Sequence, residues 1–205
     1  PSPASSTATP ERRGAVSNHP AEHKGRRVVV AHTPEEWRSW LAAESATSGA
    51  VWLTVWKQAA GPDKLTYEDV VLEALCVGWI DSTVNGFDDL SFLQLLSPRK
   101  KGSVWSAPNK ARVERLVAEG RMQPSGQAVI DASIADGSWT ILDPVEAMIE
   151  PDDLAQAIDA AGLRTAWDAW SPSRRKQTLY RLVLAKTAPT RAKRIVEATD
   201  ELRGA

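Results

Sequence analysis

The sequence is poor in several residue types that often identify a function. It has one cysteine, three histidines and two methionines, and nine of its thirteen aromatic residues are tryptophan. A single cysteine excludes an internal disulfide framework and fits a reducing compartment, so we expect a cytoplasmic protein. No apolar run approaches the ~20 residues that span a bilayer, which argues against membrane insertion. A net charge of −1 makes nucleic acid an improbable partner.

Catalytic and metal-binding patterns are also scarce. His19 and His23 lie in the N-terminal segment, His32 follows a short apolar run, and none of the three has a partner at catalytic or metal-ligand spacing. No glycine-rich phosphate loop occurs, so we predict neither a metal nor a cofactor. Cys76 falls on the apolar side of a predicted helix, and we interpret it as a buried side chain rather than a nucleophile.

The composition along the chain predicts four segments. The first 25 residues are Ser, Pro, Ala and charged residues without an apolar stretch, so we expect a disordered tail and neither a signal peptide nor an anchor. The expected fold class is α+β: a small β-sheet with flanking helices, followed by an all-helical C-terminal lobe. The segments are a tail (1–25), an α+β lobe with a Trp/basic motif (26–121), a helix and connector (122–150) and a helical domain (151–205).

Local signals predict the individual elements. Apolar and alternating runs predict strands at Val28–Ala31, Ala50–Lys57, Trp79–Val84 and Leu90–Leu96. Capping residues and prolines predict helices that begin at Thr33, Thr66, Ser106, Pro124, Pro151, Ser171 and Thr187.

Charge is distributed unevenly. Residues 122–163 contain eight acids and no Lys or Arg, whereas residues 171–194 contain eight Lys or Arg and no acid. Residues 98–121 add seven basic groups against two acids. The basic segments either form a face that accepts an anion, or they pack beside the acidic helices and are neutralised.

A basic loop between two tryptophans predicts a ligand site. Arg99 offers a planar fork that suits carboxylate or phosphate, Gly102 permits close backbone approach, and Ser106 begins a helix. Trp79 and Trp105 either stack on a planar ligand or belong to the core. We expect one concavity between the sheet and the helical lobe, lined by Trp79, Asp81, Arg99, Lys101, Ser103, Trp105, Ser106, Asn109 and Arg112.

Acid–base chemistry has two candidates, Asp81 and Tyr67. Asp81 follows Trp79 and Ile80, where a predicted strand leaves a helix. It either acts as a base or binds a cation at the sheet edge, or it forms a structural ion pair with Arg99 or caps a turn.

Several sequence blocks together resemble the YdeI/OmpD-associated family, also described as bacteriocin-protection. The resemblance covers roughly Arg26–Arg203, and Val77 and Phe92–Leu96 depart from the family pattern. The blocks are Cys76–Asp81, Ser97–Ser106, Asn109 with Arg112, Gly120–Met122 with Gly126, Ser171–Lys176, Ala185–Lys186 and Thr190–Ile195. The resemblance implies a bacterial protein linked to antimicrobial resistance and envelope stress. It supplies no catalytic residues. The Ala-, Arg- and Trp-rich composition is typical of a high-GC bacterium, which argues against the porin partner of other members.

The leading prediction is a cytoplasmic bacterial stress or antimicrobial-resistance protein that binds an anionic, partly planar small molecule between its lobes. One alternative is an enzyme that uses Asp81 or Tyr67 as an acid or base on that ligand. Another is an interaction module whose basic helices bind an acidic protein or nucleic acid.

Overall fold

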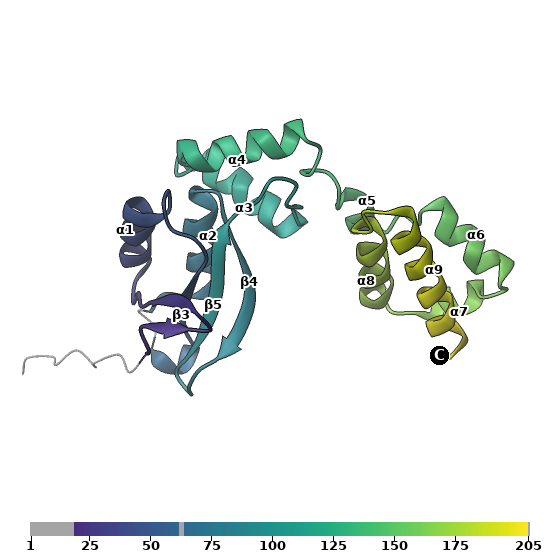
Figure 1. Ribbon diagram of the computed structural model, residues 1–205, viewed down its shortest axis with the longest axis horizontal. Coiled ribbons are helices and arrows are strands. Elements are labelled where there is room, and N and C mark those ends of the chain that lie inside the picture. The colour runs from purple at the N-terminus through teal and green to yellow at the C-terminus, as the bar shows by residue number, and fades with distance from the viewer. Residues whose placement is uncertain (1–18, 62–63, 205) are drawn as a thin grey trace, which may run out of the picture.

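The computed structural model describes residues 19–61 and 64–204, and it shows an α+β protein, as predicted. A sheet flanked by helices is followed along the chain by a body made of helices (Figure 1). The strands are β1 (Glu22–His23), β2 (Arg26–Val29), β3 (Val51–Trp56), β4 (Trp79–Gly86) and β5 (Ser91–Pro98). The α-helices are α1 (Pro34–Glu44), α2 (Tyr67–Cys76), α3 (Ala107–Ala118), α4 (Pro124–Ala135), α5 (Asp143–Glu146), α6 (Asp152–Ala160), α7 (Arg164–Ala169), α8 (Pro172–Val183) and α9 (Ala188–Arg203), and a 3-10 turn occupies Gln58–Ala60.

The sheet is mixed and has the strand order β1-β2-β3-β5-β4. Strands β2 and β3 are parallel and are connected through α1, while the other neighbouring pairs are antiparallel. The central strand β3 alternates as predicted from Val51 to Val55, because Val51, Leu53 and Val55 belong to one core cluster and Trp52 belongs to another. Trp56, expected on the face of Trp52, instead packs against the cluster of Val51.

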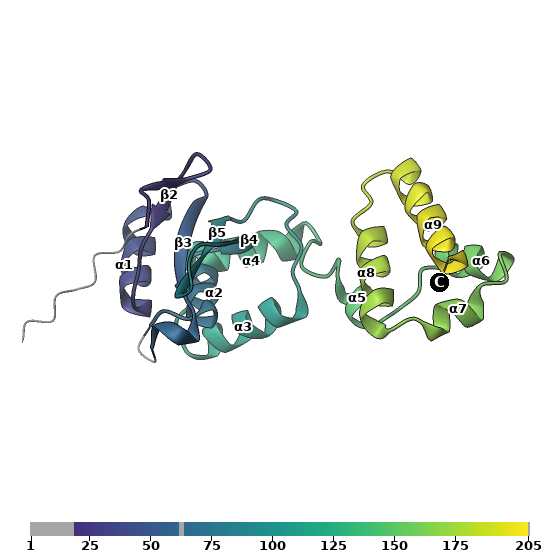
Figure 2. The same cartoon turned by 90° about the horizontal axis from the view of Figure 1, so that it is seen from below.

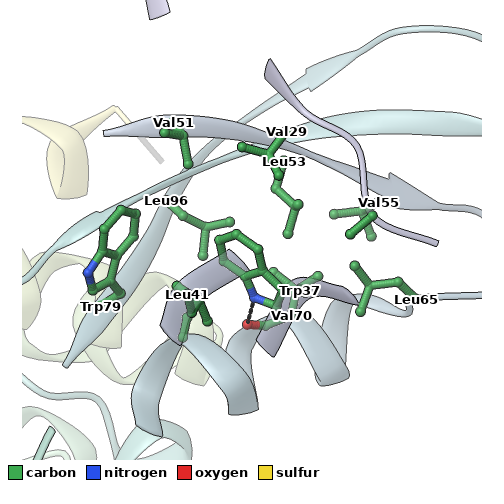
Figure 3. Packing of buried hydrophobic residues seen from close by; sticks show 12 residues of the cluster. Val29, Trp37, Leu41, Val51, Leu53, Val55, Leu65, Val70, Trp79 and Leu96 are labelled. Atoms are coloured by element: carbon green, nitrogen blue, oxygen red, sulfur yellow. Dashed lines mark hydrogen bonds between the residues drawn. The ribbon is translucent and has the colours of Figure 1, made fainter. Parts of the chain in front are cut away.

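Helices α1 and α2 cover one face of the sheet and form the main core with it (Figure 3). Trp37 of α1 lies in this core, where its indole Nε1 donates a hydrogen bond of 3.2 Å to the Val70 carbonyl of α2. Thr33 caps α1 and Thr66 forms a capping box with Asp69 at the start of α2, so both predicted helix starts are confirmed.

A second core lies on the other side of α2, where α3 and α4 pack. It contains Leu72 and Leu75 of α2, Leu116 of α3 and Ile130 of α4. Helix α4 therefore packs with the sheet-containing body rather than with the C-terminal helices.

The C-terminal helices have a core of their own, formed around Leu154, Ile158, Trp167 and Leu182. The segment that precedes α5 connects the two bodies in both views (Figures 1 and 2). None of the helices that the structure describes is long and apolar enough to cross a membrane.

The expectation of a tail over residues 1–25 is wrong for its last part, and residues 1–18 lie outside the described residues. Strand β1 pairs with β2, and His23 makes an edge contact with Trp52 at 5.0 Å between ring centres. His19 stacks on Phe87 at 4.4 Å. The composition of the N-terminal segment does not predict this ordered part, because its contacts are made with Trp and Phe side chains that are distant in sequence.

Candidate functional site

The predicted site residue Trp79 is part of the main core. Its side chain is 2% exposed and packs in the cluster that contains Leu41, Val51 and Leu96 (Figure 3). Trp105 is 1% exposed and belongs to the second core, with α2, α3 and α4. The two indoles therefore lie in different cores rather than on the walls of one concavity.

Arg99 and Trp105, in contrast, are in direct contact. Arg99 follows the last residue of β5, and its backbone N–H donates to the Gly78 carbonyl at 3.0 Å. The guanidinium carbon lies 3.4 Å from the centre of the Trp105 ring. At this separation the cation is attracted by the face of the indole. The first residue of the predicted basic loop, Arg99, therefore points into the protein rather than into solvent.

The guanidinium of Arg99 is buried and only partly hydrogen-bonded. The residue is 8% exposed, and Nη1 donates to the Val104 carbonyl at 3.2 Å. Nε and Nη2 have no hydrogen-bond partner in the part of the chain that the structure describes. Burial lowers the pKa of Arg99 to about 10, although the nearby Asp81 carboxyl opposes the shift. One edge of a buried cation is therefore free to donate two hydrogen bonds.

The two acid–base candidates, Tyr67 and Asp81, are bonded to each other. The Tyr67 hydroxyl donates to Asp81 Oδ2 at 2.7 Å, which connects the first turn of α2 to β4. Partial burial raises the pKa of Tyr67 to about 12, and the bond to Asp81 adds to the shift. Tyr67 is consequently a protonated hydrogen-bond donor at neutral pH.

Arg112 and Asn109 of α3 lie next to this pair, but Arg112 already has an anionic partner. Its Nε and Nη2 both donate to the Glu68 carboxylate, with the shortest contact at 2.7 Å, and Nη1 donates to Asn109 Oδ1 at 3.0 Å. The hydrogen bond from Arg112 lowers the pKa of Glu68. Arg112 therefore holds α3 against α2.

The remaining predicted residues lie on the loop before α3. Lys101 is exposed in a turn, and Ser103 Oγ accepts a hydrogen bond of 3.1 Å from the Lys100 backbone. Ser106 occupies the N-cap position of α3, as predicted, but its side chain makes no capping hydrogen bond to the described residues. The structure therefore brings Arg99 to Trp105 and Tyr67 to Asp81, and it leaves Trp79 apart in the main core.

A separate pocket was not predicted from the sequence. It encloses about 770 Å³ between α1, the C-terminal half of α2 and the turn that joins α3 to α4. Its wall contains Glu73, whose carboxylate accepts hydrogen bonds from Arg38 and Arg121. Glu73 is an acid within the apolar run Val70–Cys76, and that irregularity is the one local signal that could have suggested the pocket.

The charge segments of the C-terminal body are paired with each other. Between the acidic segment 122–163 and the basic segment 171–194, Arg191 pairs with Asp153 at 2.6 Å and Lys176 pairs with Glu146. This pairing supports the interpretation that acidic and basic helices neutralise one another. Within residues 19–61 and 64–204, no group of three or more His, Cys, Asp and Glu side chains could hold a metal ion.

Comparison with known families divides the chain into the same two bodies. Residues 147–204 match the family described as bacteriocin-protection, YdeI or OmpD-associated, and the chain thus carries a C-terminal domain of that family. The predicted family is confirmed for residues 147–204, whereas the earlier blocks of the resemblance, from Cys76 to Gly126, lie outside this match. Residues 29–129, which contain the Arg99 and Glu73 clusters, match a domain of unknown function, DUF8412. No curated protein and no solved structure gives a significant match.

Proposed function

We propose that the protein is a cytoplasmic bacterial stress and antimicrobial-resistance protein that binds a small anion with a planar or apolar body beside Arg99. The C-terminal domain supports the bacteriocin-protection context. The observation that carries the ligand-binding part is the unpaired Nε/Nη2 edge of Arg99, since buried polar groups in folded proteins are nearly always hydrogen-bonded.

Other arginines of the chain support a carboxylate or phosphate as the partner of that edge. Arg38, Arg112 and Arg191 each donate from Nε and Nη2 to a carboxylate: Glu73, Glu68 and Asp153 respectively. These two parallel N–H groups match the two oxygens of a carboxylate or phosphate. The same edge of Arg99 therefore fits an external anion, while Trp105 packs on the face of the guanidinium.

The surroundings favour a ligand with more than a charge. The Asp81 carboxylate, which accepts from Tyr67, interacts electrostatically with Arg99, and the exposed Lys101 adds positive charge on the loop. Val104, whose carbonyl accepts from Arg99, packs its side chain against the C-terminal core. A ligand beside Arg99 would accordingly lie close to the seam of the two bodies.

Isothermal titration with benzoate, and with the uncharged benzamide as its isostere, tests the proposal. Benzoate should bind and benzamide should not, because only the carboxylate can accept both hydrogen bonds. Arg99→Lys keeps the charge but loses the paired donors, and it should weaken benzoate binding by about tenfold or more. The matched control is Arg115→Lys on the exposed surface of α3, which should bind like the wild type.

Equal affinity of the Arg99→Lys and wild-type proteins for benzoate would refute the site. Native mass spectrometry of the protein as purified supplies the natural ligand's mass. Loss of that bound mass in Arg99→Lys, with retention in Arg115→Lys, would locate the ligand at Arg99.

An enzyme is the second candidate, because Tyr67 donates directly to Asp81, whose carboxylate interacts electrostatically with Arg99. With its pKa raised to about 12, Tyr67 would serve as a proton donor to a bound anion rather than as a base. Tyr67→Phe should then leave benzoate binding intact and abolish turnover of the co-purified ligand. Unchanged turnover in Tyr67→Phe would eliminate this role.

An acidic protein or nucleic acid partner has less support, because many basic side chains of α8 and α9 are already paired.

A further inference from the structure

We propose that the pocket beside Glu73 is a second ligand site, which binds an amphipathic monocarboxylate with its chain along α1, α2 and α4 and its carboxylate between Arg38 and Arg121. The pocket shares no lining residue with the Arg99 cluster, so the inference goes beyond the proposed function. Its volume of about 770 Å³ lies in the range of small-molecule sites.

The charges at one end of the pocket leave room for an anion. Glu73, with a side chain that is 4% exposed, accepts from Nη2 of both Arg38 and Arg121 at 2.7 Å. Arg121 also pairs with Glu119, which Arg115 contacts in turn. Arg38, Arg115 and Arg121 thus meet the two carboxylates of Glu73 and Glu119, which leaves one positive charge in excess. The side chains of Arg38 and Arg121 remain 54% and 32% exposed, and both residues line the pocket. A ligand carboxylate would balance this cluster and accept charge-assisted hydrogen bonds.

The remainder of the wall is mainly apolar. Leu41 and Ala42 of α1, Cys76 and Val77 at the end of α2, and Pro124 at the start of α4 line it. Such a surface suits an aliphatic chain, whose removal from water yields roughly 25 cal/mol per Å². The polar end and the apolar wall together specify an amphipathic ligand rather than a bare anion such as phosphate.

The far wall is held rigidly, so the pocket is preformed. A Cβ at Gly126 in the first turn of α4 would lie 2.3 Å from the Cys76 carbonyl oxygen. A Cβ of any other residue at Gly78 would lie 2.7 Å from Val129 Cγ2. Helix α4 therefore touches the end of α2 at backbone distance and cannot move inward to close the space. A preformed site reduces the ordering cost of binding.

The probe for this site is octanoate, with octanamide as its uncharged isostere, and the measurement is isothermal titration. Octanoate should bind and octanamide should bind at least about tenfold more weakly, because the carboxylate forms charge-assisted hydrogen bonds. Ala42→Phe places a bulky side chain in the pocket from an exposed position of α1, so the protein should fold and lose octanoate binding. Ala43→Phe, also exposed on α1 but absent from the pocket lining, is the matched control and should bind like the wild type.

Cys76 provides a local readout, because it lines the pocket and is the one cysteine of the sequence. Octanoate should slow the alkylation of Cys76 by iodoacetamide in Ala43→Phe and have no such effect in Ala42→Phe. Equal affinities for octanoate and octanamide, or undiminished binding in Ala42→Phe, would overturn the proposal. If Arg99→Lys abolishes octanoate binding while Ala42→Phe retains it, the carboxylate site is the one at Arg99, and the pocket is not a ligand site.

Discussion

Replacing Arg99 with Met should abolish anion binding and leave the free energy of unfolding nearly unchanged. Burial displaces the Arg99 pKa from 12.5 to about 10. Since each pKa unit corresponds to about 1.4 kcal/mol, holding this charge in the folded state costs about 3 kcal/mol. Two buried N–H groups without partners in the described structure are consistent with that cost.

Two favourable contacts of Arg99 offset the cost. Its stacking on Trp105 contributes about 2 kcal/mol in a desolvated setting. Its hydrogen bond to the Val104 carbonyl contributes about 1 kcal/mol. Met retains a side chain of comparable length and a favourable sulfur–aromatic contact with Trp105. The net change in the free energy of unfolding should therefore stay within about 1 kcal/mol of zero.

Urea denaturation followed by tryptophan fluorescence measures the change, with Arg38→Met as the matched control. Removing Arg38 takes away two of the three hydrogen bonds that reach the buried Glu73 carboxylate, and it should cost about 2 kcal/mol. A loss of more than about 2 kcal/mol in Arg99→Met would refute the reasoning, because Arg99 would then be a structural residue.

Other predictions concern the surroundings of the two sites. Cys76→Ala should lower the free energy of unfolding, measured by urea denaturation, by about 1 kcal/mol. Burial raises the pKa of the Cys76 thiol to about 11, so the native thiol should react slowly with a bulky maleimide. Rapid labelling would contradict the buried position. Tyr67 should lose its proton in a spectrophotometric titration near pH 12. Its contribution to stability should vanish as the pH rises from 10 to about 12, because the unfolded chain releases that proton first, and Tyr67→Phe should remove this pH dependence. Gly126→Ala should lower the free energy of unfolding by about 1–3 kcal/mol through the clash with the Cys76 carbonyl, whereas Gly49→Ala, with open space around it, should not.

Features that depend on neighbours in sequence were predictable. The caps at Thr33 and Thr66 and the alternation of β3 need only a few consecutive residues, and the structure confirms them. The β4–β5 hairpin follows from two apolar runs around a turn, and its strands pair from Trp79 with Pro98 to Gly86 with Phe92. Such signals are local, so one sequence suffices to read them.

The relative positions of distant side chains were not predictable in the same way. Trp79 begins β4 and Trp105 follows β5, yet their side chains belong to the cores on opposite sides of α2. Which core a tryptophan enters depends on the packing of α3 and α4, which no local pattern specifies. The convergence of Arg38 and Arg121 on Glu73 is equally nonlocal, since their elements are adjacent only in the folded chain.

Val104 contacts both Arg99 and the core of the C-terminal helices. Its carbonyl accepts from Arg99, while its side chain packs against the core of the C-terminal helices. Any ligand that shifts this one residue alters both contacts at once. Thermodynamic linkage makes such coupling reciprocal. A partner that binds the C-terminal domain and displaces Val104 would change the affinity for the anion by some factor, and the anion would change the affinity for that partner by the same factor. Binding of the anion to one domain would then alter the binding properties of the other through a single residue.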